Sequence, residues 1–159
     1  MRRVTVSIGQ PTDRKPPYHF SAFTRVAFSD TDAQGVVYYG RYNPFFDLAR
    51  VEYHRFLGML DRDRPFGAFV MRASHVVYEA PAGFDDLLEI FVRVSRIGRT
   101  SATYDLAAYR ADDDRLTCSA EQTVVLVDRE ERRPVPIPDV YRTVVTTFEG
   151  AGVEVGAPQ

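Results

Sequence analysis

The sequence has little of several features, and each shortage excludes a class of protein. It contains one cysteine, Cys118, which excludes an internal disulfide and a cysteine-based zinc site. No apolar run approaches the roughly 20 residues of a membrane-spanning helix, and the apolar stretch near the N-terminus is shorter than that of a signal peptide. We therefore expect a cytoplasmic protein without a membrane span.

Positive charge comes almost wholly from one residue type. Lys15 is the single lysine, against 19 arginines, and the formal net charge is −2. Nucleic-acid-binding proteins normally show a strong basic excess, so no nucleic-acid partner is expected.

The common catalytic motifs are missing as well. The sequence has no P-loop, no G-x-S-x-G, no G-x-G-x-x-G and no H-E-x-x-H. Its three histidines, His19, His54 and His75, are scattered along the chain. Cys118 falls in the middle of an expected strand, where a small buried apolar role is expected rather than that of a nucleophile.

What is present matches one soluble globular domain. The chain has 159 residues, of which 45% are hydrophobic and 26% charged. Proline, glycine and polar residues near the two ends predict a flexible arm over residues 1–19 and a flexible tail over residues 150–159. The single domain is expected over residues 20–149.

One segment, about residues 39–57, has the spacing of an amphipathic helix. Its apolar positions are Tyr42, Phe45, Phe46, Ala49, Tyr53, Phe56 and Leu57. Gly58 suits a C-terminal cap. Two starts are compatible with the pattern, one near Tyr39 and one at Asn43, which precedes a proline.

The rest of the domain favours strands joined by short turns. The expected strands cover about residues 21–29, 69–79, 87–97, 100–110 and 116–128, and a short helix follows Pro138. Short links between consecutive strands imply antiparallel pairing. A single long helix must bury its apolar stripe against the sheet, so the fold class is α+β, with about five antiparallel strands around one long helix. Unpaired edge strands are often covered by dimerisation.

The unusual segment is residues 28–40. Asp30 and Asp32 stand at a strand end, Gly35 marks a turn, and an apolar-aromatic run then enters the helix. This places a carboxylate just before a helix N-terminus, whose N–H groups can polarise a carbonyl, as acyl transfer requires. Two other interpretations stay open: hydrogen bonds of Asx-type turns, and a D-x-D site for a divalent metal.

This segment resembles the signature of hotdog-fold acyl-CoA thioesterases of the 4-hydroxybenzoyl-CoA thioesterase family, which includes the thioesterases associated with the Tol–Pal system. The matching elements are Phe28, Asp30, Asp32, Gly35, Val36-Val37, Tyr38-Tyr39 and Ala49-Arg50. The segments 74–78, 81–82, 85–88 and 97–101 resemble later strands and turns of the family. The resemblance covers about residues 21–145.

The resemblance implies a hotdog fold and hydrolysis of an acyl-CoA to a free acid and coenzyme A, without metal or other cofactor. It makes Asp32 the nucleophile or general base, and the backbone N–H of Tyr39 the group that polarises the thioester carbonyl. Gly35, Tyr38 and His75 are the expected substrate contacts, although His75 also fits a hydrogen-bonded strand histidine. Asp30 is expected to bind turn N–H groups.

The resemblance further implies a site shared between copies, in a homodimer or homotetramer, with residues 71–75 of a partner facing Asp32. Coenzyme A phosphates are expected at Arg96, Arg99, Arg132 and Arg133, since arginine suits phosphate recognition. Solvated surface arginines are the alternative.

Two other functions remain open for the same fold. One is a protein that binds acyl-CoA or an acyl carrier without turnover. The other is a hydratase or dehydratase, which commonly uses a histidine that the segment around Asp32 lacks. The acyl group is open too, since the apolar and aromatic residues suit aromatic and short or medium aliphatic acids.

Overall fold

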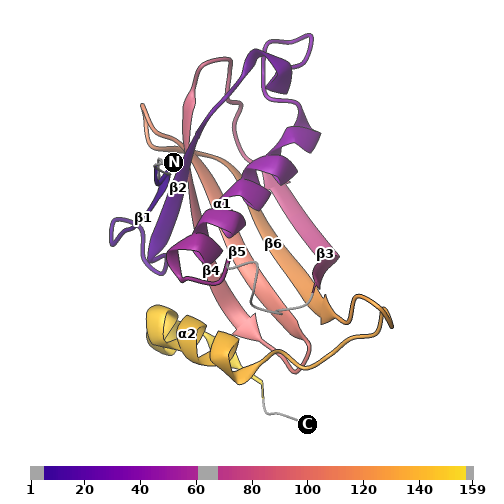
Figure 1. Ribbon diagram of the computed structural model, residues 1–159. Coiled ribbons are helices and arrows are strands. Elements are labelled where there is room, and N and C mark those ends of the chain that lie inside the picture. The colour runs from indigo at the N-terminus through magenta and orange to yellow at the C-terminus, as the bar shows by residue number, and fades with distance from the viewer. Residues whose placement is uncertain (1–5, 61–67, 157–159) are drawn as a thin grey trace, which may run out of the picture.

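The computed structural model describes residues 6–60 and 68–156. In this part of the chain, a twisted sheet packs on one long helix, and a second helix crosses one end of the sheet (Figure 1). The helices are α1 (Tyr42–Phe56) and α2 (Asp139–Glu149). The strands are β1 (Gly9–Pro11), β2 (Phe20–Arg25), β3 (Ala68–Tyr78), β4 (Leu87–Ile97), β5 (Ser101–Arg110), β6 (Arg115–Val127) and β7 (Glu154–Val155). The expected α+β class is confirmed.

The strands lie in the order β1-β2-β4-β5-β6-β3, and β7 pairs with β4. All pairs along this order are antiparallel, whereas β7 is parallel to β4. The described residues therefore contain seven strands rather than about five. The two additional strands, β1 and β7, are two or three residues long.

Both additional strands fall in segments that were expected to be flexible. Gly9–Pro11 pairs with β2, and the Arg14 side chain forms an ion pair with the buried carboxylate of Glu89 on β4. Ser21 donates a second hydrogen bond to Glu89. Backbone and side-chain partners on the sheet therefore contact residues 9–14, whereas the flexibility expected for the two ends stays a prediction.

The first expected strand is too long at its C-terminal end. It stops at Arg25 rather than at Ser29, because Phe28–Asp30 forms a 3-10 turn. The Asp30 carboxylate stabilises this turn by accepting a hydrogen bond from the N–H of Ala27, at 2.7 Å. A polar side chain that bonds local backbone competes with strand pairing.

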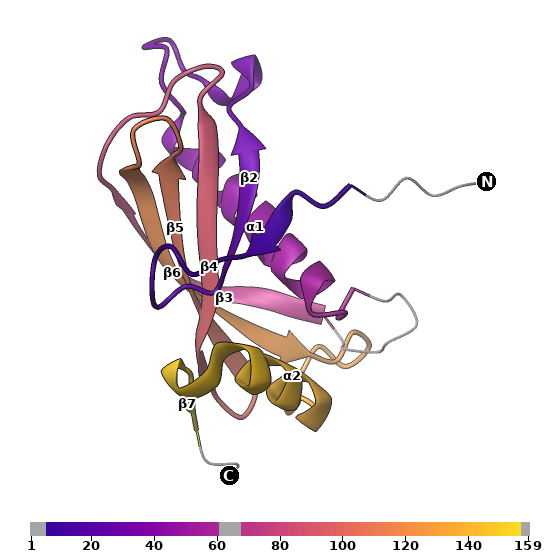
Figure 2. The same ribbon diagram turned by 90° about the vertical axis from the view of Figure 1, so that its left-hand side faces the viewer.

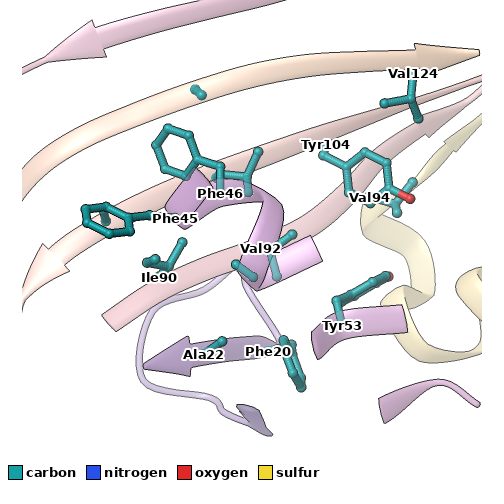
Figure 3. Packing of buried hydrophobic residues seen from close by; sticks show 14 of the residues in the cluster. Phe20, Ala22, Phe45, Phe46, Tyr53, Ile90, Val92, Val94, Tyr104 and Val124 are labelled. Carbon is teal, nitrogen blue, oxygen red and sulfur yellow. The ribbon is translucent and has the colours of Figure 1, made fainter. Parts of the chain in front are cut away.

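The long helix begins in two stages. A 3-10 turn covers Tyr39–Arg41, and α1 follows from Tyr42, so the helical run starts near Tyr39. The apolar face of α1 is buried against the sheet, with Phe45 and Phe46 facing Ile90 of β4 (Figure 3). Burying one such side chain stabilises the fold by about 1.5–3 kcal/mol.

Polar side chains are buried at the other end of α1. The ring nitrogen Nε2 of His54 lies 2.8 Å from the Tyr104 hydroxyl, which lies 2.6 Å from that of Tyr141. Tyr53 donates a hydrogen bond of 2.7 Å to the Glu149 carboxylate. Burial, with the nearby charge of Arg50, lowers the pKa of His54 from 6.5 to about 4, whereas burial raises the pKa of Glu149.

Acidification is expected to destabilise the protein through His54. Between pH 6.5 and about 4, the unfolded chain binds a proton at His54 that the folded chain does not, so stability falls as the pH is lowered through this window. The loss approaches about 3 kcal/mol at the lower end. Glu149 acts in the opposite direction, because its folded carboxyl group retains a proton that the unfolded chain releases.

Urea unfolding of the wild type and of His54→Gln, measured from pH 4 to 7.5, separates the two contributions. Glutamine keeps a hydrogen-bonding group for Tyr104 but does not titrate. The difference in unfolding free energy between the two proteins should change with pH as His54 titrates. If the unfolding free energies of the two proteins changed with pH in parallel, this pH dependence could not be assigned to His54.

Candidate active site

Asp30 fixes the segment in which the expected catalytic residues lie. Its side chain is buried, and Oδ1 accepts a hydrogen bond of 3.0 Å from Nε of Arg41, in addition to the bond from Ala27. Its backbone carbonyl accepts the N–H of Tyr38, at 2.9 Å. The carboxylate is therefore committed to structure, as expected, and Arg41 is its unforeseen partner.

Asp32 lies on the same loop, but its side chain is exposed. Oδ1 accepts the N–H of Gln34 at 2.8 Å, which is the Asx-type turn considered above. Oδ2 has no hydrogen-bond partner among the residues that the structure describes. The Asx turn and a reactive carboxylate are therefore compatible, since the turn occupies one oxygen and leaves the other accessible.

Gly35 shapes the turn after Asp32. Its φ of 77° lies in the left-handed region that favours glycine. Its N–H donates to the Asp32 carbonyl at 3.0 Å, and the Asp32 N–H donates to the carbonyl of Val36 at 2.9 Å. The turn alone therefore explains why glycine occupies this position. Contact between Gly35 and the substrate stays a prediction.

The backbone N–H of Tyr39 is placed to act as a donor. Tyr39 is the first residue of the 3-10 turn and follows Tyr38, which has extended backbone angles. The N–H groups at a helix start have no partner within the helix, and no described residue accepts a hydrogen bond from that of Tyr39. A bridge between Thr31 and Val37 joins the two arms of the loop, so Asp32 and Tyr39 lie at the same end of the sheet.

Exposed aromatic side chains surround this loop. The rings of Tyr38 and Tyr39 have centroids 4.4 Å apart, and the Tyr78 hydroxyl, at the end of β3, donates to the Tyr39 carbonyl at 3.2 Å. Phe28 packs edge-on against Phe84, and both are more than half exposed. Tyr78 and Phe84 were not among the expected site residues, because only the folded chain brings β3 and residues 81–86 to this loop.

The phenols of Tyr38 and Tyr78 and the lone thiol are neutral at pH 7. A side-chain hydrogen bond with Tyr39 raises the pKa of Tyr38, and partial burial raises the pKa of Tyr78. Cys118 is fully buried, as expected, and burial raises its pKa to about 12, so it does not supply a thiolate. Within residues 6–60 and 68–156, no three His, Cys, Asp or Glu side chains gather as metal ligands.

His75 lies on β3 at the edge of the sheet, with an exposed side chain opposite Glu121 of β6. It precedes Tyr78 by three residues, or about 10 Å of strand. Within a single chain, His75 therefore does not contact the Asp32 loop.

The four arginines expected to bind coenzyme A lie far from Asp32 within one chain. Arg25 pairs with Leu87 at the start of β4, near the Asp32 loop, whereas Arg96 and Arg99 lie at and beyond its other end. The eleven residues of β4 span about 33 Å. Figure 1 shows the two regions at opposite ends of the sheet.

The arginines after β6 share this distant end. Hydrogen bonds of 2.9 Å join Asp128 N–H to Arg133 O, and Ile137 N–H to Arg99 O, so the loop after β6 packs beside the β4–β5 turn. Arg132 and Arg133 are exposed, and Arg133 pairs with Glu131. The structure therefore brings the segments of Arg99 and Arg132 together, but not with Asp32 of the same chain.

A family model described as the thioesterase-like superfamily matches residues 26–145. The chain belongs to this superfamily. It is 36% identical over 129 residues to the acyl-CoA thioester hydrolase YbgC of Escherichia coli O6:H1 (strain CFT073), covering 79% of this chain and 92% of the relative. It is 34% identical over 122 residues to the acyl-CoA thioesterase YbgC of Haemophilus influenzae, covering 75% and 88%.

Solved structures agree with this membership. The chain superposes on a thioesterase-superfamily protein from Jannaschia sp. CCS1 with a TM-score of 0.77 at 27% identity, covering 87% of this chain and 88% of that one. A Pseudomonas aeruginosa protein gives a TM-score of 0.76 at 27% identity, covering 85% and 94%. The expected hotdog fold is confirmed, whereas dimerisation through the sheet stays a prediction. No helix of the described residues is long and apolar enough to cross a bilayer.

Proposed function

We propose that the protein hydrolyses acyl-CoA thioesters to a free acid and coenzyme A, with Asp32 as the catalytic carboxylate. The observation that carries the proposal is the exposed Asp32 side chain, with one oxygen uncommitted, on a loop whose other arm begins a helix. The similarity to the acyl-CoA thioester hydrolase of E. coli and the acyl-CoA thioesterase of H. influenzae supports the same chemistry.

The steps follow from the groups at the loop. The thioester oxygen accepts a hydrogen bond from the Tyr39 N–H, which stabilises the negative charge that develops on it. Asp32 either attacks the carbonyl carbon or takes a proton from the water that attacks it. The C–S bond then breaks and the sulfur leaves as coenzyme A, taking up a proton. Where Asp32 attacks, water then hydrolyses the resulting anhydride, which releases the free acid and restores the Asp32 carboxylate. Both roles require the Asp32 carboxylate.

A second copy of the chain is the proposed partner of β3. This strand has eleven residues, lies at the edge of the sheet and exposes the apolar side chains of Val70, Met71, Val77 and Tyr78. A long, exposed, apolar edge strand invites pairing with another strand. We expect a homodimer by sedimentation, and a single-chain mass at micromolar concentration would contradict this pairing.

Antiparallel pairing of the two β3 strands would complete the site. It places the Ala68 end of one copy beside the Tyr78 end of the other, and Ala68 lies opposite Val127, just before the loop that holds Arg132 and Arg133. The arginines of the second copy would thereby reach the end of the sheet that carries Asp32. Arg99 and Arg132 are the proposed contacts for the coenzyme A phosphates, with Arg96 and Arg133 beside them.

Thiol release from a panel of acyl-CoAs tests the proposed function. The panel runs from acetyl to palmitoyl and adds benzoyl, phenylacetyl and 4-hydroxybenzoyl thioesters. We expect release of coenzyme A from at least one group of related substrates. Coenzyme A binding by calorimetry without release from any member would instead indicate a binding protein without turnover.

A further inference from the structure

Arg41 makes two contacts with the loop that carries Asp32. This loop, drawn in purple, lies beyond the C-terminal end of β2, at the end of the sheet opposite α2 (Figure 2). The N–H of Arg41 donates to the carbonyl of Tyr38 at 2.9 Å, and its side-chain Nε donates to Oδ1 of Asp30 at 3.0 Å. Arg41 therefore binds the residue before Tyr39 with its backbone, and a residue close to the proposed catalytic carboxylate with its side chain.

The backbone contact fixes the direction of the Tyr39 N–H. The carbonyl of Tyr38 and the N–H of Tyr39 belong to one planar, trans peptide group, so the two bonds point in opposite directions. The hydrogen bond from Arg41 holds that carbonyl. A second bond, from the N–H of Tyr38 to the carbonyl of Asp30 at 2.9 Å, holds the preceding peptide group. Arg41 and Asp30 together therefore set the direction in which the proposed oxyanion donor points.

The side-chain contact joins the two arms of the loop, residues 27–34 and 36–42. The first arm carries the proposed catalytic carboxylate and the second carries the proposed donor. In the part of the chain that the structure describes, the pair of Asp30 with Arg41 is the one hydrogen bond between side chains of the two arms. The Asp30 side chain is 8% exposed, and its other oxygen accepts the N–H of Ala27. Arg41 is therefore tied to a firmly held point of the first arm.

We propose that Arg41 is a positioning residue, which holds the Tyr39 N–H at the distance and direction from Asp32 that hydrolysis requires. The inference rests on the proposed thioesterase function and adds a residue on which that function depends. Arg41 acts through Asp30 and Tyr38, and contact with the substrate is not required. Since a displacement of about 1 Å near reacting groups can cost 10²-fold in rate, the expected loss is in kcat rather than in KM.

Arg41→Met and Arg41→Gln separate the hydrogen bond from the charge, which both variants lack. Glutamine can place an N–H donor where Nε of arginine stands, whereas methionine places a methyl group there. Arg41→Met should lower kcat about 10- to 100-fold and leave KM within about threefold, and Arg41→Gln should keep kcat within about threefold of the wild type. Wild-type kcat in Arg41→Met, or an equal loss in both variants, would overturn the inference. If Arg41→Met does not fold, Arg41→Ala, which leaves room for water beside Asp30, should show the same loss.

Arg55→Met is the matched control. Nε of Arg55 also donates to a carboxylate, that of Glu52 at 3.3 Å, and the two pairs are exposed to a similar extent. The control pair lies near the C-terminal end of α1, away from the loop. Arg55→Met should hydrolyse acyl-CoA at the wild-type rate. A loss as large as that of Arg41→Met would show that removing any such ion pair slows hydrolysis, and would contradict a special role of Arg41.

A double variant tests whether Arg41 acts through the Tyr39 N–H. Tyr39→Pro removes that N–H, so the group that Arg41 positions is absent. In the Tyr39→Pro background, Arg41→Met should therefore lower kcat by less than about threefold, because the effects of coupled residues do not add. A further loss as large as that in the otherwise wild-type protein would show that Arg41 acts independently of the N–H, and would overturn the inference.

Amide hydrogen exchange separates this inference from the proposed function. The Tyr38 N–H is bound by the Asp30 carbonyl, so its exchange rate reports the state of the loop without substrate. It should exchange faster in Arg41→Met than in the wild type or in Arg41→Gln. Faster exchange in Arg41→Met, in a protein whose wild type releases no thiol, would retain the positioning of the loop and reject the hydrolase. Thiol release by Arg41→Met at the wild-type rate, with unchanged exchange, would retain the hydrolase and reject Arg41 as its positioning residue.

Discussion

Replacing Asp32 by asparagine is expected to lower kcat for thioester hydrolysis by about 10²- to 10⁴-fold. Asparagine keeps a side-chain oxygen that can accept the N–H of Gln34, so the turn at 2.8 Å is preserved. It provides neither a nucleophilic carboxylate nor a base for water. Thiol release under saturating substrate measures the loss, and the melting temperature should stay within about 2 °C of that of the wild type, since surface substitutions change stability little.

Asp112→Asn is the matched control, because Asp112 is also exposed but lies in the β5–β6 turn. It should hydrolyse the same substrates at the rate of the wild type. Wild-type kcat in Asp32→Asn would reject Asp32 as the catalytic carboxylate, in either of its two roles. A parallel loss in both variants would point to a general effect of removing surface charge.

Replacing Tyr39 by proline is expected to lower kcat by about 10²- to 10³-fold, the cost of one oxyanion donor. Proline removes the backbone N–H, which no described residue uses. The position tolerates proline, because Tyr39 is the first residue of a helical turn and Tyr38, with φ −62° and ψ 133°, has the backbone that precedes proline.

Tyr39→Ala distinguishes the backbone from the side chain. It removes the exposed ring but retains the N–H, so its kcat should exceed that of Tyr39→Pro by at least about tenfold. Its KM is expected to rise, since the ring lies beside Tyr38 and Tyr78 at the edge of the loop. Equal kcat values for the two variants would show that the ring, rather than the N–H, is what hydrolysis requires.

Local patterns predicted the elements that depend on neighbouring residues. The strands from β3 to β6 lie within one or two residues of their expected bounds, because alternation and turn residues are local signals. The shortened β2 was missed because the Asp30 carboxylate binds backbone of its own turn. β1 and β7 were missed because each is a few residues long and depends on strands distant in sequence.

In the candidate site too, features set by neighbouring residues could be predicted from the sequence, and features that join distant segments could not. Asp32 and Tyr39 could be proposed from the sequence because they belong to one continuous segment with a recognisable spacing. That Arg50 and Gln122 line one pocket could not be predicted, since 72 residues separate them in the sequence. The same holds for Tyr78, which reaches the loop from the end of β3.

The separation of Asp32 from the arginines at the other end of the sheet has a genetic consequence. If each site combines Asp32 of one copy with the arginines of another, a chain lacking Asp32 and a chain lacking Arg99 and Arg132 are each inactive alone. Co-expressed in one cell, the two alleles would form mixed dimers with one doubly defective site and one intact site. Two loss-of-function alleles of a single gene would then complement each other, which a site contained in one chain does not allow.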